Sequence, residues 1–229
     1  MTAGAVAIVL AAGSGERLGE GTPKAFVPVD GRPILVRAVS AALASPAVGA
    51  VVVTAPPGRE GLAHRMLEPL GAHVVVTGGP TRQRSVRAAL SAIPADVQAI
   101  VCHDAARCLA QPQLFEAVLD ALRRADGAIP VVPVADTVKR LDDGVIAGTL
   151  DRDELGLAQT PQAFRAEALR EAHRIAEESD VEATDDAMLL ELAGYRVVAV
   201  PGDPGNFKIT TREDLDRAER VLREAVRGA

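Results

Sequence analysis

Val6-Ala7-Ile8-Val9-Leu10 runs directly into Ala11-Ala12-Gly13, and three more glycines follow at positions 15, 19 and 21. The first five residues are apolar at every position and partly β-branched, which is typical of a parallel strand covered on both faces. Glycine and alanine after such a strand let backbone N–H groups approach a phosphate without obstruction by side chains. The stretch therefore predicts an α/β fold with an anion-binding loop at the carboxyl end of its first strand.

Strand-like and helix-like segments alternate through the next hundred residues. Predicted strands cover residues 51–53, 74–76, 100–102 and 128–134, and predicted helices cover residues 34–44, 61–70, 81–92 and 112–125. We expect Pro33 in the first turn of the first helix. Strict alternation requires a Rossmann-like, mostly parallel twisted sheet with helices on both faces.

The segment from 137 to 155 departs from this alternation. Residues 138–141 and 145–149 are strand-like and are joined by Asp142-Asp143-Gly144, a sequence typical of a hairpin turn. A hairpin without a core of its own usually packs on something else, so we expect a protruding arm that packs on a second subunit.

The C-terminal part returns to helices and strands, and we expect residues 1–229 to form one domain without a second enzyme fused to it. Predicted helices cover residues 165–178, 185–193 and 212–227, and predicted strands cover residues 195–200 and 207–209. Thr210 and Glu213 are expected to form a capping box at the start of the last helix.

The composition excludes several classes of function. The 229 residues carry a formal net charge of −6 with both signs interleaved, which argues against a nucleic-acid groove or an anionic membrane surface. No apolar run reaches the roughly 18 residues of a membrane span, and no signal peptide precedes the first strand. Two cysteines and four histidines have no metal-ligand spacing. We expect a cytoplasmic protein.

Two cations accompany the first glycine-rich loop. Arg17 lies within it and Lys24 follows closely. Leu18 occupies the third glycine position of a dinucleotide fingerprint, and no Gly-Lys-Ser/Thr follows as in a Walker A loop. Transfer of a nucleotidyl group builds negative charge on the α-phosphate and on pyrophosphate, which fixed cations stabilise. The loop predicts nucleotidyl transfer; the alternative is a glycine-rich turn with two solvated charges.

Two further strand ends carry polar residues. Asp104 and Arg107 follow the strand at 100–102, at the edge of an open sheet where ligands bind. A lone carboxylate beside phosphates suits Mg²⁺, so Asp104 is the candidate metal ligand, and an Asp–Arg ion pair is the alternative. Gly78-Gly79 and Ser85 follow the preceding strand and are candidates for contact with a nucleotide base.

Taken together, these segments resemble the 2-C-methyl-D-erythritol 4-phosphate cytidylyltransferase family over nearly the whole chain. The first loop is shared with many sugar-nucleotide pyrophosphorylases, so the resemblance depends on the ordered set of motifs. That set comprises Ala11-Ala12-Gly13 with Arg17 and Lys24, Gly78-Gly79, His103-Asp104-Ala105-Ala106-Arg107, Asp136-Thr137-Val138-Lys139, Thr160-Pro161-Gln162, Thr184-Asp185 and Asn206-Phe207-Lys208-Ile209-Thr210. Leu10, Pro80 and Cys108 depart from the family's pattern; Pro80 has no N–H to offer a nucleotide.

The resemblance implies an Mg²⁺-dependent reaction of CTP with a polyol phosphate in a homodimer joined by the hairpin arm. It implies that Arg17, Lys24 and Lys208 surround the reacting phosphorus and that Asp104 serves Mg²⁺ and the substrate. By the same resemblance, the CTP site is lined by Ala11, Ala12, Gly13, Gly15, Gly79, Ser85 and Ala105, and the substrate is held by Asp104, Arg107, Thr137, Thr160, Thr184 and, from the partner subunit, Arg152.

Three alternatives remain at this point. A cytidylyltransferase for ribitol 5-phosphate or a related polyol phosphate would keep the CTP site and change the residues around Arg107, Thr137 and Thr184. A pyrophosphorylase using UTP or GTP fits the C-terminal motifs poorly. A catalytically silent nucleotide-binding regulator would have no physical reason to keep Arg17, Lys24 and Lys208 together.

Overall fold

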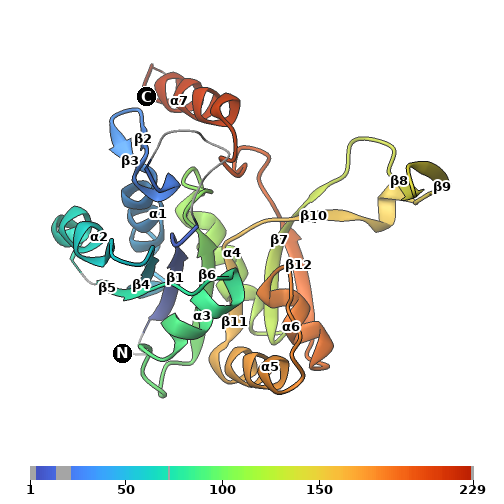
Figure 1. Cartoon of the computed structure of the whole chain (residues 1–229), viewed down its shortest axis with the longest axis horizontal. Coiled ribbons are helices and arrows are strands. Elements are labelled where there is room, and N and C mark those ends of the chain that lie inside the picture. Colours follow the sequence, from blue (N-terminus) through green and yellow to red (C-terminus); the bar gives the residue numbers. More distant parts are fainter. Residues whose placement is uncertain (1–3, 14–21, 72, 228–229) are drawn as a thin grey trace.

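A single eight-stranded sheet forms the centre of the molecule (Figure 1). The computed structural model describes residues 4–13, 22–71 and 73–227. The strands of the sheet are β1 (Ala5–Leu10), β4 (Val48–Ala55), β5 (His73–Thr77), β6 (Ala99–Asp104), β7 (Gly127–Pro133), β10 (Gly156–Ala158), β11 (Gln162–Arg165) and β12 (Val197–Pro201). Their order is β10-β7-β11-β6-β1-β4-β5, and β12 pairs with β7.

Most of the neighbouring strands are parallel, as predicted. β1 pairs in parallel with β4 and β6, β4 with β5, and β12 with β7. β11 is antiparallel to both β6 and β7, and β10 is antiparallel to β7. The carboxyl ends of β1, β5 and β6 consequently lie at one edge of the sheet, where the predicted ligand-binding loops begin.

Helices cover both faces of the sheet, which confirms the predicted fold class. The long helices are α1 (Ile34–Leu43), α2 (Glu60–Leu67), α3 (Arg82–Leu90), α4 (Pro112–Ala121), α5 (Ala166–Glu178), α6 (Asp186–Leu192) and α7 (Arg212–Arg227), and three-residue 3₁₀ turns are η2 (Lys24–Phe26), η3 (Glu68–Leu70) and η4 (Arg152–Glu154). Pro33 immediately precedes α1 as its N-cap instead of lying in the first turn.

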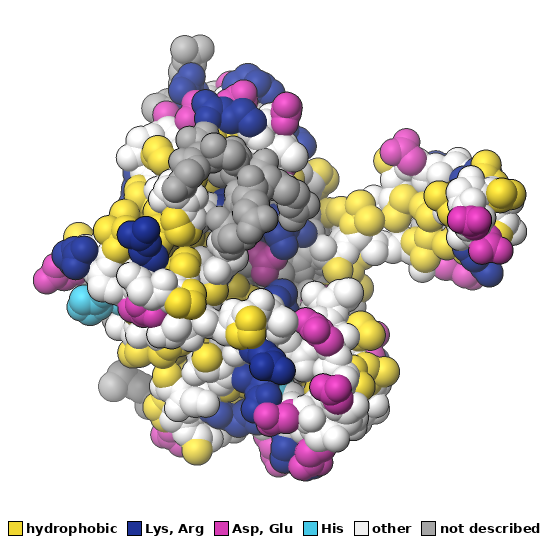
Figure 2. Space-filling view, viewed as in Figure 1, with side chains coloured by type: hydrophobic (Ala, Val, Ile, Leu, Met, Phe, Trp, Pro, Cys, Tyr) yellow, Lys and Arg dark blue, Asp and Glu magenta, His cyan; other side chains and the backbone are white. Residues whose placement is uncertain are grey.

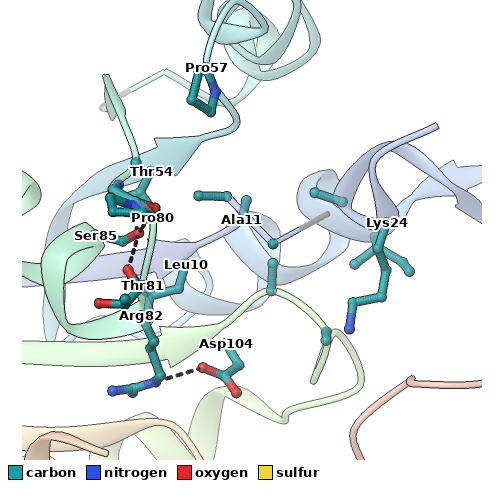
Figure 3. A pocket seen from close by; sticks show the side chains of 18 of the residues that line it. Leu10, Ala11, Lys24, Thr54, Pro57, Pro80, Thr81, Arg82, Ser85 and Asp104 are labelled. Carbon is teal, nitrogen blue, oxygen red and sulfur yellow. Dashed lines mark hydrogen bonds and ion pairs between the residues drawn. The ribbon is translucent and has the colours of Figure 1, made fainter. Parts of the chain in front are cut away.

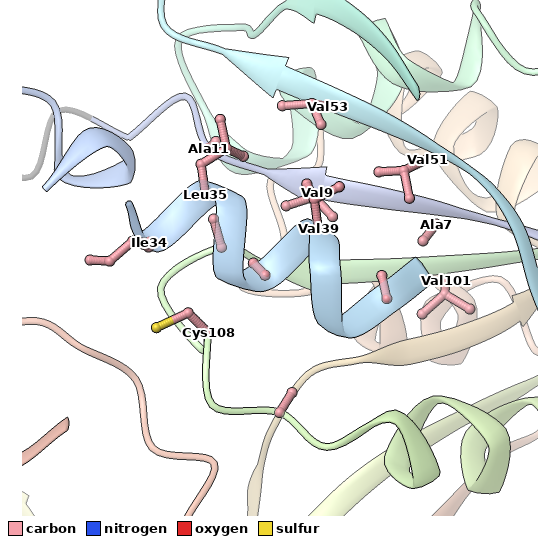
Figure 4. Packing of buried hydrophobic residues seen from close by; sticks show 14 of the residues in the cluster. Ala7, Val9, Ala11, Ile34, Leu35, Val39, Val51, Val53, Val101 and Cys108 are labelled. Atoms are coloured by element: carbon pink, nitrogen blue, oxygen red, sulfur yellow. The ribbon is translucent and has the colours of Figure 1, made fainter. Parts of the chain in front are cut away.

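The alternation of side chains along β1 divides the core into two clusters. Ala7 and Val9 face α1, α2 and α4, whereas Val6 and Ile8 face α3, α5 and α6. Figure 4 shows α1 lying along the first of these faces. Because successive side chains of a strand point to opposite faces, one apolar strand serves both layers. This burial holds β1 at the centre and fixes where its C-terminal loop begins.

Two hairpins turn on an Asp-Gly pair. β2 (Pro28–Val29) and β3 (Arg32–Pro33) are joined by Asp30-Gly31, and β8 (Lys139–Asp142) and β9 (Val145–Thr149) by Asp143-Gly144. Both residues of each pair have positive φ, as a type I′ turn requires. The second hairpin was predicted; the first was not.

β8 and β9 stand away from the body of the protein (Figures 1 and 2). They form a separate two-stranded sheet. Leu141, Val145 and Ile146 are each more than 60% exposed. We call residues 137–155 the arm; within this single chain its apolar side chains are largely exposed to solvent.

Three expectations about secondary structure were wrong or incomplete. Residues 207–209 are not a strand: they have no regular secondary structure, and the Ile209 N–H donates to Ala106 O instead. The short strands β10 and β11 were not predicted. The last helix is capped by Thr211 and Asp214, one residue later than expected, since Thr211 Oγ1 accepts from the N–H of Asp214. No described helix has the length and apolarity needed to cross a membrane.

Candidate active site

A cavity of about 620 Å³ lies at the carboxyl ends of β1, β5 and β6. It brings together segments that are distant in the sequence: the loop after β1, the loop after β5, the end of β6 and the segment before α7 (Figure 3). The lining residues are Leu10, Ala11, Ala12, Gly13, Lys24, Ala25, Ile34, Thr54, Pro57, Gly78, Gly79, Pro80, Thr81, Arg82, Ser85, Asp104, Ala105, Ala106 and Lys208. We call the loops at 11–13 and 78–82, together with Ser85, Asp104, Ala105 and Lys208, the cradle.

The first loop of the cradle continues the hydrogen bonds of the sheet. The Ala11 N–H donates to Thr54 O and the Ala105 N–H donates to Leu10 O, each at 3.0 Å. These two N–H groups are therefore committed to the protein. Ala11 and Ala105 can offer a nucleotide an apolar wall and carbonyl oxygens, but not these donors.

The second loop packs tightly on the first. A Cβ atom at Gly78 would overlap the Cβ of Ala12 and approach Ala55 O to 3.2 Å. Glycine is therefore needed at 78 for contact between the two loops, a reason different from the predicted contact with a nucleotide base.

Ser85 holds this second loop in shape. Its buried Oγ accepts from the Gly79 N–H at 3.0 Å and donates to Thr81 O at 2.9 Å. The predicted hydrogen bond from Ser85 to a base would compete with these bonds. Ser85 lines the cavity, and its contact with a nucleotide stays a prediction.

Asp104 lies between two cations at the end of β6. Its Oδ2 is 2.7 Å from Lys208 Nζ and its Oδ1 is 3.3 Å from Arg82 Nε. Burial alone would raise the pKa of Asp104, but Arg82 and Lys208 outweigh burial and hold this pKa below its usual range. Asp104 is thus an anion at every pH near neutrality.

Lys24 also lines this cavity, and in Figure 3 it lies across from Pro80, Thr81 and Ser85. Its Nζ donates to Ile209 O at 3.1 Å, so it contacts the residue that follows Lys208. The structure therefore brings Lys24 and Lys208 to one cavity, as the motifs suggested. Arg17 and Gly15, which were assigned to the same site, lie outside the described residues.

Arg107 and Thr160 are held by hydrogen bonds within the protein. Arg107 donates to the carbonyl oxygens of Asn206 and Ala158 at 2.8 and 3.3 Å. Thr160 is buried, and its Oγ1 accepts from the N–H of Asp104 at 3.0 Å. In this arrangement both residues position the end of β6 and the segment before Lys208, and neither is among the residues that line the cavity.

Thr137, Arg152 and Thr184 are exposed and lie away from the cavity lining. Arg152 is in the arm, where its Nη1 donates to Ala135 O at 2.7 Å. Thr184 immediately precedes Asp185, the N-cap of α6. The single chain does not bring these three residues to the site, and their contact with a substrate stays a prediction.

The described residues contain no group of three or more His, Cys, Asp or Glu side chains that could hold a metal ion. Asp104 is the carboxylate among the cavity-lining residues of the described chain. Mg²⁺ commonly takes one or two carboxylates and completes its shell with phosphate and water. The donor set therefore fits an ion that arrives with a triphosphate, and does not fit an ion held in a cage of protein ligands.

Sequence reasoning assigned no role to Arg82, although this side chain lines the cavity and contacts Asp104. Its position directly after the Gly78-Gly79 turn, at the first residue of α3, placed it at the correct sheet edge. What the sequence did not indicate is the pairing with Asp104, because 22 residues separate the two along the chain.

The three residues that depart from the family's pattern lie either in the core or in the wall of the cavity. Cys108 is buried in the core, and burial raises the pKa of its thiol to about 11. Leu10 and Pro80 line the cavity. The Cys108 change is accordingly one of packing, whereas Leu10 and Pro80 contribute to the cavity wall.

Comparison with known proteins gives a consistent result. The family model for 2-C-methyl-D-erythritol 4-phosphate cytidylyltransferase matches residues 5–224. The chain belongs to this family. The cytidylyltransferase of Rhodococcus opacus is 48% identical over 222 residues, covering 96% of this chain and 95% of the relative. That of Frankia casuarinae is 47% identical over 219 residues, covering 94% of this chain and 80% of the relative.

Solved structures of cytidylyltransferases share the fold. The crystal structure of the Thermus thermophilus enzyme is similar with a TM-score of 0.80 and 36% identity, covering 96% of this chain and 99% of that one. The 4-diphosphocytidyl-2C-methyl-D-erythritol synthase of Anaerococcus prevotii is similar with a TM-score of 0.86 and 29% identity, covering 96% and 98%. The chain is thus a nucleotidyltransferase of the family that the motifs indicated, and a silent regulator is not needed to explain them.

Proposed function

We propose that this chain transfers CMP from CTP to 2-C-methyl-D-erythritol 4-phosphate and releases pyrophosphate. The observation that carries the proposal is the convergence of Lys24 and Lys208 on a cavity walled by glycine and alanine. Membership of the cytidylyltransferase family indicates which nucleotide and which alcohol are the substrates. The product is 4-diphosphocytidyl-2-C-methyl-D-erythritol, an intermediate of non-mevalonate isoprenoid biosynthesis.

The reaction needs no covalent intermediate on the enzyme. An oxygen of the substrate phosphate attacks the α-phosphorus of CTP, a new P–O bond forms, and the bond from the α-phosphorus to the bridging oxygen of pyrophosphate breaks. Pyrophosphate leaves with the electron pair. Negative charge spreads over the equatorial oxygens during this step, so positioned cations contribute most of the stabilisation.

Lys24 and Lys208 both line the cavity, although they come from segments far apart in the sequence. Lys24 would hold the triphosphate and the developing charge on the leaving group. Lys208, fixed by Asp104 at 2.7 Å, would hold the incoming phosphate against the α-phosphorus. We assign Arg17 to the triphosphate as well, on the strength of the family motif alone.

We propose that Mg²⁺ enters with the triphosphate and that Asp104 is its protein contact. When bound, such an ion neutralises phosphate charge and orients the triphosphate. Asp104 Oδ1 accepts from Arg82 and Oδ2 accepts from Lys208, and each oxygen keeps a second lone pair that could bind an ion.

The arm supports a homodimer. Leu141, Val145 and Ile146 expose apolar area on a hairpin that has no core of its own, and a second copy of the chain would cover it. Arg152 of the same arm would then reach the substrate site of the partner subunit, which explains why it lies far from the cavity of its own chain. A cytoplasmic location, without nucleic-acid or membrane partners, fits the net charge of −6.

A pyrophosphate-release assay across CTP, UTP, GTP and ATP, each with 2-C-methyl-D-erythritol 4-phosphate or ribitol 5-phosphate, tests the proposal. We expect release with CTP and the methylerythritol phosphate, with kcat/KM at least about tenfold above every other pair. Higher kcat/KM with ribitol 5-phosphate would overturn the assignment of the alcohol. Higher kcat/KM with another nucleotide would overturn the assignment of CTP.

A further inference from the structure

We propose that Arg82 is a positioning residue for the reaction: it fixes the carboxylate of Asp104, and through it the ammonium of Lys208, in the cavity. This inference rests on the proposed cytidylyl transfer, in which Lys208 faces the reacting phosphates. It assigns a role to a side chain that the motifs did not single out.

The geometry is a chain of alternating charges. Lys208 Nζ lies 2.7 Å from Asp104 Oδ2, and Arg82 Nε lies 3.3 Å from Asp104 Oδ1 (the dashed contact in Figure 3). The Nη1 of Arg82 lies 2.7 Å from Oδ2 of Asp186. The guanidinium therefore bridges a carboxylate of the cavity and a carboxylate of α6, a use that suits its rigid fork of donors.

The inner end of the chain is firmly anchored. The side chain of Asp186 is 1% exposed, and its Oδ1 accepts from Nε2 of the buried His173 on α5 at 3.0 Å. The outer end is not anchored by burial, because the side chain of Lys208 is 44% exposed. Order at Lys208 therefore depends on Asp104, whose carboxylate is held on its other oxygen by Arg82.

Other contacts fix the backbone of Asp104 but not its carboxylate. Thr160 Oγ1 accepts from the Asp104 N–H at 3.0 Å, and this bond sets the end of β6. Rotation of the carboxyl group is limited by its two cationic partners. Loss of Arg82 would leave Lys208 paired with a carboxylate free to turn toward solvent.

Stability alone does not account for an arginine at this position. Arg82 is the first residue of α3, where the helix dipole disfavours a cation, and no acidic residue lies in the first turn. Its Nη2 is buried without a hydrogen-bond partner among the described residues, which costs free energy. Buried ion pairs are often no more stabilising than apolar side chains of similar volume. What an arginine provides here is a link between two carboxylates, which holds Asp104 in place relative to the buried Asp186.

A double-mutant cycle tests the inference with the purified full-length protein, CTP and 2-C-methyl-D-erythritol 4-phosphate. We expect Arg82→Met to lower kcat by about 10- to 100-fold, with a smaller change in the KM for CTP. In the Lys208→Met background, the same change should lower kcat by less than about threefold, because its effect is transmitted through Lys208. Arg84→Met, on the exposed side of the same helix, is the matched control and should leave kcat within about twofold of wild type.

Additive losses in the cycle would overturn the inference, since they would mean that Arg82 acts on the ligand directly or only on the fold. If Arg82→Met does not fold, Asp186→Asn enters the same cycle, because it removes the anchor of Arg82 with little change in volume. Its effect on kcat should likewise vanish in the Lys208→Met background, and additivity would again overturn the inference. Turnover by the wild-type protein tests the proposed function separately. If the wild type turns over and the losses are additive, only the positioning role of Arg82 is rejected. If the wild type does not turn over, the proposed function is rejected as well.

Discussion

The cradle and the arm are built on opposite principles. The cradle lies at the carboxyl ends of the strands of the central sheet, and its residues bond to one another across long sequence distances, as Asp104 does with Arg82 and Lys208. The arm bonds almost entirely within itself, and its apolar residues face solvent. In the cradle, the proposed reaction needs side chains in fixed positions. In the arm, exposed side chains can pack against a second subunit. A change in the cradle should therefore affect catalysis and stability, and a change in the arm should affect assembly.

Replacement of Lys24 should give the largest effect. We expect Lys24→Ala to lower kcat by at least about 10²-fold, because it removes a cation positioned for the transition state. Pyrophosphate release measures the loss of turnover, and urea unfolding of the same variant measures any accompanying change in stability. Unchanged turnover would remove the proposed mechanism.

A methyl group at position 78 should loosen the cradle. Gly78→Ala places a Cβ against the Cβ of Ala12, and overpacking of this kind costs about 1–3 kcal/mol of unfolding free energy. Gly13→Ala is the matched control, because a Cβ there meets no described residue within 4 Å, and we expect a loss of about 0.5 kcal/mol or less. Equal destabilisation by the two substitutions in urea unfolding would show that the loops are not packed as described.

The buried histidine beside Asp104 should make folding sensitive to acid. Burial lowers the pKa of His103 to about 4, against 6.5 for the free side chain. Between these values the unfolded chain binds a proton that the folded chain does not, so stability falls as pH falls, by about 1.4 kcal/mol per pH unit. The lowered pKa values of Asp104 and Asp186 matter only at still lower pH.

Urea unfolding from about pH 7 to about pH 4 measures this slope. His103→Gln removes the titrating group, and we expect the slope across this window to become shallower by about the same 1.4 kcal/mol per pH unit. An unchanged slope in the variant would mean that other groups cause the acid sensitivity.

A polar residue in the arm should change assembly and leave the fold almost unchanged. We expect Ile146→Asn to shift the protein from dimer to monomer in sedimentation velocity, with about 0.5 kcal/mol or less lost from the unfolding free energy of the monomer. Asp143→Asn, in the turn of the same hairpin, is the control, because asparagine tolerates the positive φ of this position. If the Ile146→Asn variant remains a dimer, the arm does not form the dimer contact.

What the sequence predicted well was local. The strand at β1, the glycines after it and the Asp143-Gly144 turn follow from short patterns whose cause lies within a few residues. Lys24, Asp104 and Lys208 could be assigned to one cavity because the family motifs occur together and in order.

What the sequence did not predict depends on distant partners. β11 has only four residues with polar ends, and it is a strand because β6 and β7 pair with it on either side. Residues 207–209 have the apolar content of a strand but find no neighbouring strand, since Ile209 N bonds to Ala106 O instead. The role of Arg82 could not be predicted from neighbouring residues, because it depends on Asp104 and Asp186, which are distant in the sequence.

The place of β11 in the sheet also affects how this chain folds while it is being synthesised. β6 ends at Asp104, yet the strand that covers its second edge begins at Gln162, after the whole arm has been synthesised. Until then the nascent sheet presents a bare row of peptide groups, the kind of edge that invites pairing with another chain. Translation speed through the arm therefore sets how long the growing polypeptide is open to misassembly.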